Sequence, residues 1–168
     1  MPTFRSFDPN NPDDATAFRE LNEAWIMQYF ALEAKDLEVL GDPVKYILRP
    51  GGEIVMAMLD NRAVGCCALL PMSDGGFEIG KMAVSEGCRG QGIGKKLLAY
   101  VIERAWQLGA KRLYLETNAK LPNAIHIYEA QGFRHLPPER VLPSPYARSG
   151  IYMELLPDPP KTPAILAE

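Results

Sequence analysis

Residues 77–98, FEIGKMAVSEGCRGQGIGKKLL, decide the fold and the site of this 168-residue chain. Their first eight residues are mostly apolar and follow Gly75-Gly76, as expected of a strand bounded by a turn. Four glycines then crowd into positions 87–94, and apolar residues return at helical spacing from Ile93. A glycine-rich turn before a helix exposes backbone N–H groups at the positive end of the helix dipole, where phosphates bind. The stretch therefore predicts a strand, a phosphate-binding loop and a helix.

The spacing of the residues excludes two common phosphate-binding motifs. A dinucleotide motif G-x-G-x-x-G that starts at Gly90 would need glycine in place of Lys95. A Walker A motif that ends in Gly94-Lys95 would need glycine in place of Arg89 and Ser or Thr in place of Lys96. The loop therefore binds its phosphates in another way.

The chain before this stretch predicts an edge strand, helices and a hairpin. Thr3 to Phe7 is the strand, residues 13–31 form an amphipathic helix, and residues 32–49 form a helical stretch broken at Gly41-Asp42-Pro43. Residues 53–59 and 64–70 are apolar runs separated by a four-residue turn, which predicts two strands buried on both faces. With residues 77–84 they make three antiparallel strands in succession.

The chain after the loop predicts a parallel crossover. The helix from Ile93 ends before Gly109, and residues 112–117 form the next strand, so that strand, helix and strand make a right-handed connection. A short helix follows over 123–131, and residues 133–136 and 151–156 form two last strands. We predict a mixed α/β sheet with central antiparallel strands, one parallel crossover and about four helices. One domain spans 1–156, and a loosely ordered proline-rich tail spans 157–168.

Composition excludes several classes of partner. The net charge of −3 gives no reason to expect nucleic acid, and no apolar run approaches the roughly 18 residues of a membrane span. The first residues lack the layout of a signal peptide. Cys66, Cys67 and Cys88 fit neither a disulfide framework nor a metal site. We expect a reduced, cytoplasmic protein without a metal, and a homodimer is compatible with the sequence.

Two motifs resemble those of one family. Arg89-x-x-Gly92-x-Gly94, placed between a strand and a helix, resembles the acyl-CoA pyrophosphate loop of the GNAT superfamily of N-acetyltransferases. About 30 residues later, residues 123–133 (NAIHIYEAQGF) are similar to that family's N-x-x-A-x-x-x-Y-E-x-x-G-F segment. The helical opening and the LETN at 115–118 look most like the branch whose domain is sometimes fused to a winged-helix regulator, and here the acetyltransferase domain is expected to fill the chain.

The resemblance implies acetyl-CoA as the co-substrate. Its pantetheine arm would lie where the strand 77–84 splays from the next parallel strand, against backbone groups of that strand, and its pyrophosphate would lie in the loop. The implied cofactor-binding residues are Met82, Ala83, Val84, Arg89, Gly90, Gln91, Gly92, Ile93, Gly94, Lys95, Asn118, Asn123 and Tyr128. Asn123 also stands at the expected start of its helix, where Asn is a favoured N-cap.

The resemblance also implies two catalytic residues. Tyr128 matches the general acid that protonates the departing CoA thiolate, although an aromatic residue at helical spacing also packs in a core. Glu78 lies six residues before Val84, the spacing of the strand glutamate that some members use as a base. Period-two alternation places Glu78, Gly80, Met82 and Val84 on one face of the strand. The alternative for Glu78 is a strand-end carboxylate held by solvent or by an arginine.

The amine acceptor is expected between the first two helices and the loop before the last strand. The candidate residues there are Trp25, Tyr29, Glu33, Asp36, Tyr146 and Arg148. Glu33 and Asp36 suit a cation and Arg148 suits a carboxylate, as for an amino acid, but a polar helix face explains these residues equally well. We expect an N-acetyltransferase that acts on a primary amine of a small molecule or peptide. The alternative is a non-catalytic acyl-CoA-binding or sensing domain.

Overall fold

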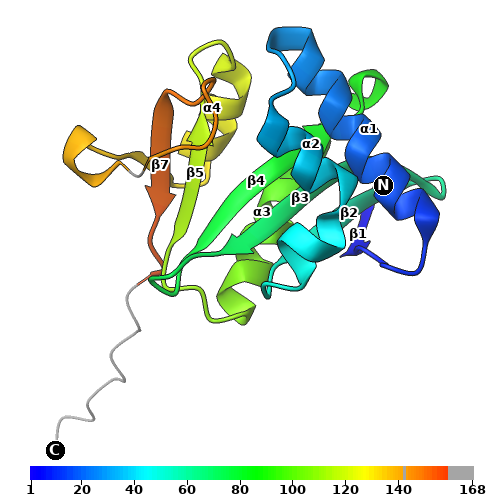
Figure 1. Cartoon of the computed structure of the whole chain (residues 1–168), viewed down its shortest axis with the longest axis horizontal. Helices are drawn as coiled ribbons and strands as arrows, with labels where there is room; N and C mark the ends of the chain where they lie inside the picture. The colour runs from blue at the N-terminus through cyan, green and yellow to red at the C-terminus, as the bar shows by residue number, and fades with distance from the viewer. Residues whose placement is uncertain (142, 159–168) are drawn as a thin grey trace, which may run out of the picture.

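The computed structural model describes residues 1–141 and 143–158, and they form one mixed sheet with helices on both faces (Figure 1). The sheet has seven strands in the order β1-β2-β3-β4-β5-β7-β6. Only β4 and β5 run parallel, and every other neighbouring pair is antiparallel. The strands are β1 (Thr3–Ser6), β2 (Glu53–Leu59), β3 (Arg62–Pro71), β4 (Phe77–Val84), β5 (Leu113–Thr117), β6 (Arg134–His135) and β7 (Ile151–Leu155).

Four α-helices and a π-helix in the described residues cover the sheet. The α-helices are α1 (Pro12–Tyr29), α2 (Ala34–Gly41), α3 (Ile93–Gln107) and α4 (Pro122–Ala130), and the π-helix spans Val44–Leu48. Two 3-10 segments, Glu86–Cys88 and Pro138–Arg140, lie in the connections. The predicted mixed sheet with a parallel crossover through one helix is confirmed.

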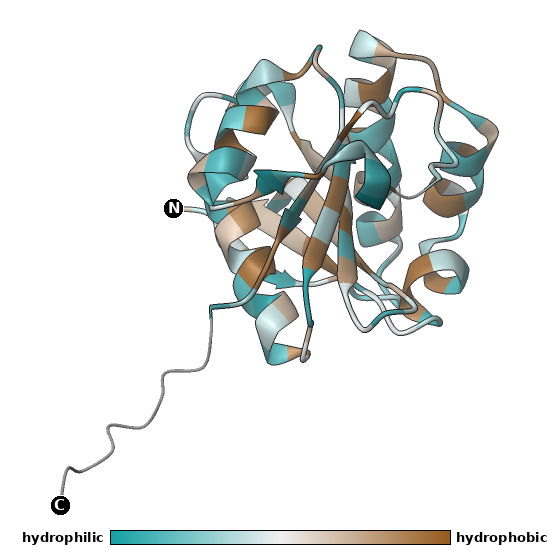
Figure 2. Cartoon of the chain, turned by 90° about the vertical axis from the view of Figure 1, so that its left-hand side faces the viewer, coloured by the Kyte–Doolittle hydropathy of each residue, from teal (hydrophilic) through white to brown (hydrophobic). Residues whose placement is uncertain are grey.

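Two apolar clusters fill the two sides of the sheet. One contains Phe18 and Ile26 of α1 with Val39 and Leu40 of α2, and the other contains the buried stripe of α3, including Leu97. Side chains of β2 and β3 contribute to both clusters, as expected for central strands. Figure 2 shows the central strands as mostly hydrophobic, whereas the helices alternate between hydrophobic and hydrophilic residues.

Several boundaries differ from the sequence prediction. The hairpin turn is tighter than expected, because Asp60 and Asn61 both take left-handed φ angles of 50° and 62° and β3 begins at once at Arg62. Such a two-residue turn matches the twist of its flanking strands. The helical break at Asp42 is confirmed, with the π-helix after it. The predicted tail lies mainly outside the described residues, which end at 158.

The parallel pair β4–β5 is joined over only three residue positions, from Phe77 opposite Leu113 to Ile79 opposite Leu115. Beyond this point β4 continues to pair with β3, and β5 continues to pair with β7. Figure 1 shows the two strands adjacent at their lower ends and apart at their upper ends. Residues 80–84 of β4 therefore have no strand partner on the side that faces β5, and their peptide groups on that side are open to a ligand.

A bulge in β4 corrects the predicted strand face. Ala68 of β3 lies opposite Gly80 and Cys66 lies opposite Ala83, so two residues of β4, Lys81 and Met82, stand against one residue of β3. Lys81 takes a left-handed φ of 50° there. An extra residue in a strand shifts everything beyond it to the opposite face.

Glu78 is therefore not on the face of Met82 and Val84, and that prediction is wrong. Met82 and Val84 pack with the α3 cluster, as do Phe77 and Ile79 on either side of Glu78. Glu78 accordingly faces the side of α1 and α2. Strict alternation fails because it assumes a regular strand, and only Lys81, a second charge inside an apolar run, hinted at the irregularity.

The predicted N-cap role of Asn123 is also wrong. The cap of α4 is Leu121, and Pro122 occupies the first turn, where proline is favoured because its missing N–H is not needed. Asn123 thus lies inside the first turn, with its side chain not needed for capping.

Candidate active site

A cavity of about 650 Å³ opens at the divergence of β4 and β5. Its walls come from the end of α1, from residues 79–84 of β4, from the glycine loop and the start of α3, and from the end of β5 through α4. Arg148 and Ser149 of the loop before β7 complete it. The cavity therefore connects the two faces of the sheet at the only parallel pair.

The first turn of α3 reaches this cavity without a cap. Gly92 is the N-cap residue and offers no side chain to the free N–H groups that follow it. Gly90 and Gly92 take left-handed φ angles of 82° and 77°, and an added Cβ at either would meet no atom within 4 Å. The glycines are thus required by backbone conformation, and the space above them is free for a ligand. Donors at a helix start suit an anion, and phosphate groups fit this cradle.

Gly94 marks close packing between three elements. A Cβ at this position would lie 3.7 Å from Val84, 3.8 Å from Met82 and 4.0 Å from Ile127. Arg89 lies at the edge of the loop, where its Nε donates to the Val84 carbonyl at 3.3 Å and its Nη1 donates to Gln28 Oε1 of α1 at 2.8 Å. The guanidinium is exposed and borders the cavity.

Tyr128 lines the cavity from α4, on the α3 side of the sheet. Its ring packs edge-on against Phe133, with centroids 5.9 Å apart. Burial raises the pKa of the phenol well above its usual value, and the nearby Cys67 thiol adds to this effect. The hydroxyl therefore keeps its proton throughout the neutral pH range.

Two carboxylates lie on the other side of the sheet. Burial and the charge of Glu116 both raise the pKa of Glu78 and the charge of Lys81 lowers it, with a net result of about 7. Burial also raises the pKa of Glu116, against hydrogen bonds from Ser144 (3.1 Å) and Tyr114 (3.4 Å). Glu116 borders the cavity, and within residues 1–141 and 143–158 neither carboxylate forms a salt bridge.

A buried ionic network joins β4, α2 and the loop before β7. The carboxylate of Asp36 is fully buried and accepts hydrogen bonds from Lys81 Nζ at 2.7 Å and from both Nη atoms of Arg148 at 2.7 and 2.6 Å. Burial would raise the pKa of Asp36, but the bonds from Arg148 and Lys81 outweigh it and lower the pKa to about 2. Lys81 also donates to the Tyr146 hydroxyl at 2.9 Å.

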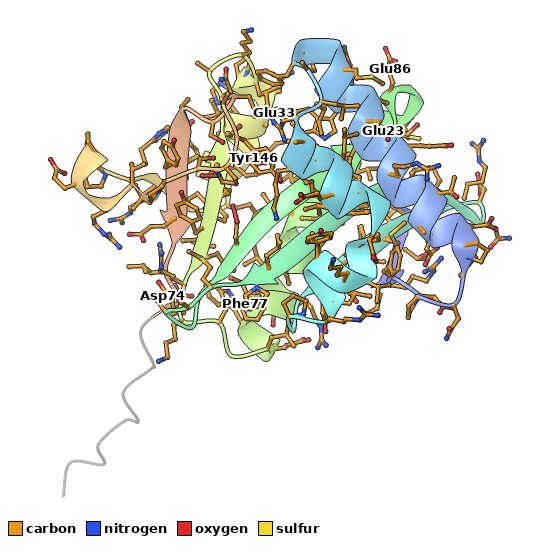
Figure 3. All side chains as sticks on the ribbon, viewed as in Figure 1. Glu23, Glu33, Asp74, Phe77, Glu86 and Tyr146 are labelled. Atoms are coloured by element: carbon orange, nitrogen blue, oxygen red, sulfur yellow. The ribbon has the colours of Figure 1, made fainter. Side chains whose placement is uncertain are left out.

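The same network fixes the loop over the cavity. Glu33 accepts hydrogen bonds from the Ala147 N–H at 2.9 Å and from Arg148 at 3.2 Å, and Figure 3 shows Glu33 and Tyr146 close together, far from Phe77 at the start of β4. On the β5 side, Asn118 Nδ2 donates to the Arg148 carbonyl at 2.6 Å. The loop thus spans from α2 to β5.

The structure brings most of the proposed site residues to one cavity. The candidates that line it are Trp25, Tyr29, Met82, Ala83, Val84, Arg89, Gly90, Gly92, Ile93, Gly94, Lys95, Asn118, Asn123, Tyr128 and Arg148. Gln91, Glu33, Tyr146 and Glu78 do not line it directly. The catalytic, cofactor and acceptor roles of all these residues remain predictions.

The lining residues that the sequence analysis did not propose include Lys81, Glu116 and Phe30. Lys81 was visible as a charge inside an apolar strand, the same signal that singled out Glu78. Glu116 was visible as an acidic residue near the end of a buried strand. Phe30 carried no signal that distinguished it from a core aromatic.

Comparison with known proteins identifies the family of the chain. Residues 15–133 match the model of the Acetyltransferase (GNAT) family, so the chain belongs to the GNAT family of acetyltransferases. Among curated proteins, the chain is 35% identical over 91 residues to the uncharacterized N-acetyltransferase YjgM of Escherichia coli, a match that covers 52% of this chain and 54% of that protein. It is 32% identical over 105 residues to the uncharacterized N-acetyltransferase YvbK of Bacillus subtilis, covering 61% and 68% respectively. The chain thus spans about half to two thirds of the length of these relatives.

Solved structures share the fold. An acetyltransferase of the GNAT family from Staphylococcus aureus Mu50 superimposes with a TM-score of 0.81 at 21% identity, covering 92% of this chain and 98% of that one. An aminoglycoside 6'-N-acetyltransferase complexed with coenzyme A gives a TM-score of 0.71 at 19% identity, covering 94% and 99%. At these identities the likeness establishes the fold alone.

Two further findings concern only the described residues. They contain no helix long and apolar enough to cross a membrane. They also hold no group of three or more His, Cys, Asp or Glu side chains arranged to bind a metal ion.

Replacing Asp36 by Asn tests the buried network. We expect the free energy of unfolding at pH 7 to fall by about 3 kcal/mol, because two cations lose their buried carboxylate. The folded pKa of Asp36 lies below its usual value, so the carboxylate stabilises the fold above about pH 4 and this contribution, roughly 2 kcal/mol, is lost as pH falls through about 2. Urea unfolding of wild type and Asp36→Asn between pH 7 and pH 2 measures both effects.

The matched control is Glu38→Gln on the same helix. Glu38 forms an exposed pair with Lys35 at 3.5 Å, which is worth under about 1 kcal/mol. An Asp36→Asn protein as stable as the Glu38→Gln control at pH 7 would contradict the assignment.

Proposed function

We propose that this protein transfers the acetyl group of acetyl-CoA directly to a primary amine of a small molecule or peptide. The observation that carries the proposal is the divergence of β4 from β5, which opens one cavity to both faces of the sheet. The cofactor-side features lie on the α3 face, and the two carboxylates lie on the face of α1 and α2. The two reactants can therefore approach the gap from opposite sides.

On the α3 side, the free N–H groups of residues 92–95 would hold the pyrophosphate, with Arg89 beside it. The unpaired edge of Met82 to Val84 would bind the pantetheine amides as a neighbouring strand would. Asn118 and Asn123 border the same space. This arrangement would place the thioester at the gap between the strands.

The reaction needs a base for the amine and an acid for the leaving thiolate. Glu78, with a pKa of about 7, would accept a proton from the ammonium group, directly or through a water molecule. The amine then attacks the thioester carbonyl, whose oxygen a backbone N–H near Val84 would polarise. Tyr128 would give a proton to the sulfur as the C–S bond breaks, and the extra proton of the attacking nitrogen would pass to the resulting phenolate as the amide forms. Positioning of both reactants in the gap supplies much of the remaining rate.

Acetyl-CoA should stabilise the folded protein. At a concentration 100 times its Kd, the free energy of unfolding should rise by about 2.7 kcal/mol, which is roughly 5 to 11 °C in melting temperature for a chain of this size. Thermal unfolding with and without acetyl-CoA measures this shift. A constant melting temperature at saturating acetyl-CoA would contradict both the transferase and the alternative sensing domain.

Tyr128→Phe should lower kcat by about 100-fold, because general acid catalysis typically contributes 10²–10⁴. The phenyl ring keeps the packing against Phe133, so the melting temperature should stay close to that of wild type. A thiol-release assay over a panel of amines measures the rate. Tyr100→Phe is the control, because Tyr100 is 40% exposed and stacks on Phe4 away from the cavity. An undiminished kcat in Tyr128→Phe would remove Tyr128 from the mechanism.

Glu78→Gln should change the pH dependence of the reaction. In wild type, kcat/KM should rise with pH through about 7, because Glu78 must lose its proton to act as a base. Burial and the charge of Glu116 favour the protonated form, and the charge of Lys81 favours the ionised form. The variant should be about 100-fold slower near pH 7 and should approach wild type above pH 10, where the amine is already neutral. Glu103→Gln, an exposed change on α3, should keep the wild-type profile. A loss of equal size from pH 6 to pH 10 would speak against a base.

A further inference from the structure

On the acceptor side of the cavity, acidic side chains outnumber basic ones. Its two cations are Lys81 and Arg148, and both already hold carboxylates: Asp36 contacts both of them, and Glu33 contacts Arg148. Two positive and two negative charges thus neutralise one another inside the network. Both Nη atoms of Arg148 donate hydrogen bonds to Asp36 or Glu33, so the guanidinium is poorly suited to bind a substrate carboxylate.

Glu116 remains outside that balance. It borders the cavity from the end of β5, and its oxygens accept hydrogen bonds from the hydroxyls of Ser144 and Tyr114. The charge of Arg148 also favours the carboxylate, but burial outweighs these interactions and raises the pKa of Glu116. Among the described residues Glu116 has no salt-bridge partner, so a cation that enters the cavity could supply one.

The position of Glu116 separates it from the proposed base. Ile79 pairs with Leu115, so Glu116 comes one residue after the last β4–β5 pair, at the mouth of the gap, and Glu78 lies before it on the same face. Aromatic rings of Trp25, Tyr29 and Phe30 line the same cavity, and the ammonium group of Lys120 lies over the Phe30 ring, 5.3 Å from its centroid. A cavity that holds a carboxylate and the rings of Trp25 and Tyr29 suits an ammonium group on an alkyl chain or sugar.

We propose that the acceptor carries a second cationic group, which Glu116 binds, besides the amine that receives the acetyl group. The substrate class is a small diamine, polyamine or amino sugar, and a free amino acid with its carboxylate is disfavoured. This replaces the zwitterion that the unpaired charges of Glu33, Asp36 and Arg148 suggested. The inference rests on the proposed acetyl transfer and names its acceptor.

Three acceptors of equal chain length test the proposal on the purified protein. They are butane-1,4-diamine, butylamine, which lacks the second cation, and 4-aminobutanoate, which has a carboxylate in its place. We expect kcat/KM to fall in this order, with the diamine about tenfold above butylamine, because an ionic hydrogen bond contributes on that scale. Equal values for diamine and butylamine, or the highest value for 4-aminobutanoate, would overturn the inference.

Glu116→Gln links the preference to this residue. Because the charge of Glu116 also raises the pKa of Glu78, the variant can change the rate with every amine, and the informative quantity is the ratio of kcat/KM for the diamine to kcat/KM for butylamine. Glu116→Gln should lower this ratio about tenfold, while Glu103→Gln keeps the wild-type ratio. Gln still accepts the hydroxyl hydrogen bonds, and an unchanged melting temperature checks the fold. An equal loss of kcat/KM for both amines would mean that Glu116 does not bind the second cation, and would overturn the assignment.

The two proposals fail in different ways. Turnover of butylamine without a preference for the diamine overturns the acceptor class alone. If acetyl-CoA raises the melting temperature but no amine releases CoA, acetyl transfer itself is overturned, and the acceptor class with it.

Discussion

The hydrogen-bonded ion pair between Lys81 and Asp36, 2.7 Å long and almost fully buried, is the constraint on which the site depends. Lys81 occupies a left-handed conformation that costs an L-residue about 1–2 kcal/mol, and glycine would be the usual choice there. Lys81 is stabilised in this conformation because its ammonium group donates hydrogen bonds to Asp36 and to the Tyr146 hydroxyl. One contact thus stabilises the strand bulge, the start of α2 and the loop before β7 together.

The bulge also explains how one strand can serve two sides of the sheet. Before it, Glu78 faces α1 and α2, and after it Met82 and Val84 face α3. The proposed acid Tyr128 and the proposed base Glu78 lie on opposite faces, and the sheet is open between them at the gap beyond Ile79. In a regular strand, Glu78 would share one face with Met82 and Val84.

Much of the fold could be predicted from the sequence, because it follows from local signals. Apolar runs, glycine stops and the strand–helix–strand spacing identified the elements around β4 within a few residues, including the parallel crossover. One error arose where a tertiary contact decides the local geometry, because the bulge at Lys81 depends on Asp36, which is 45 residues away. Another arose from a local signal that was not used, because Pro122 occupies the first turn of α4 and moves the cap away from Asn123. The pairing of Arg148 with Asp36 over 112 residues was likewise beyond any local pattern, so side chains assigned to a ligand proved to be partners of each other.

The short β4–β5 pairing has a consequence for the mechanics of the sheet. Three residue pairs join a half made of β1 to β4 to a half made of β5, β7 and β6. The rest of the connection comes from the apolar packing of α3 and α4 and from side-chain contacts such as those of Asp36 with Arg148 and of Lys81 with Tyr146. A ligand whose amide groups lie along residues 82–84 would act as an additional short strand. The sheet would be more continuous with that ligand than without it, and the ligand would then be a structural part of the folded protein.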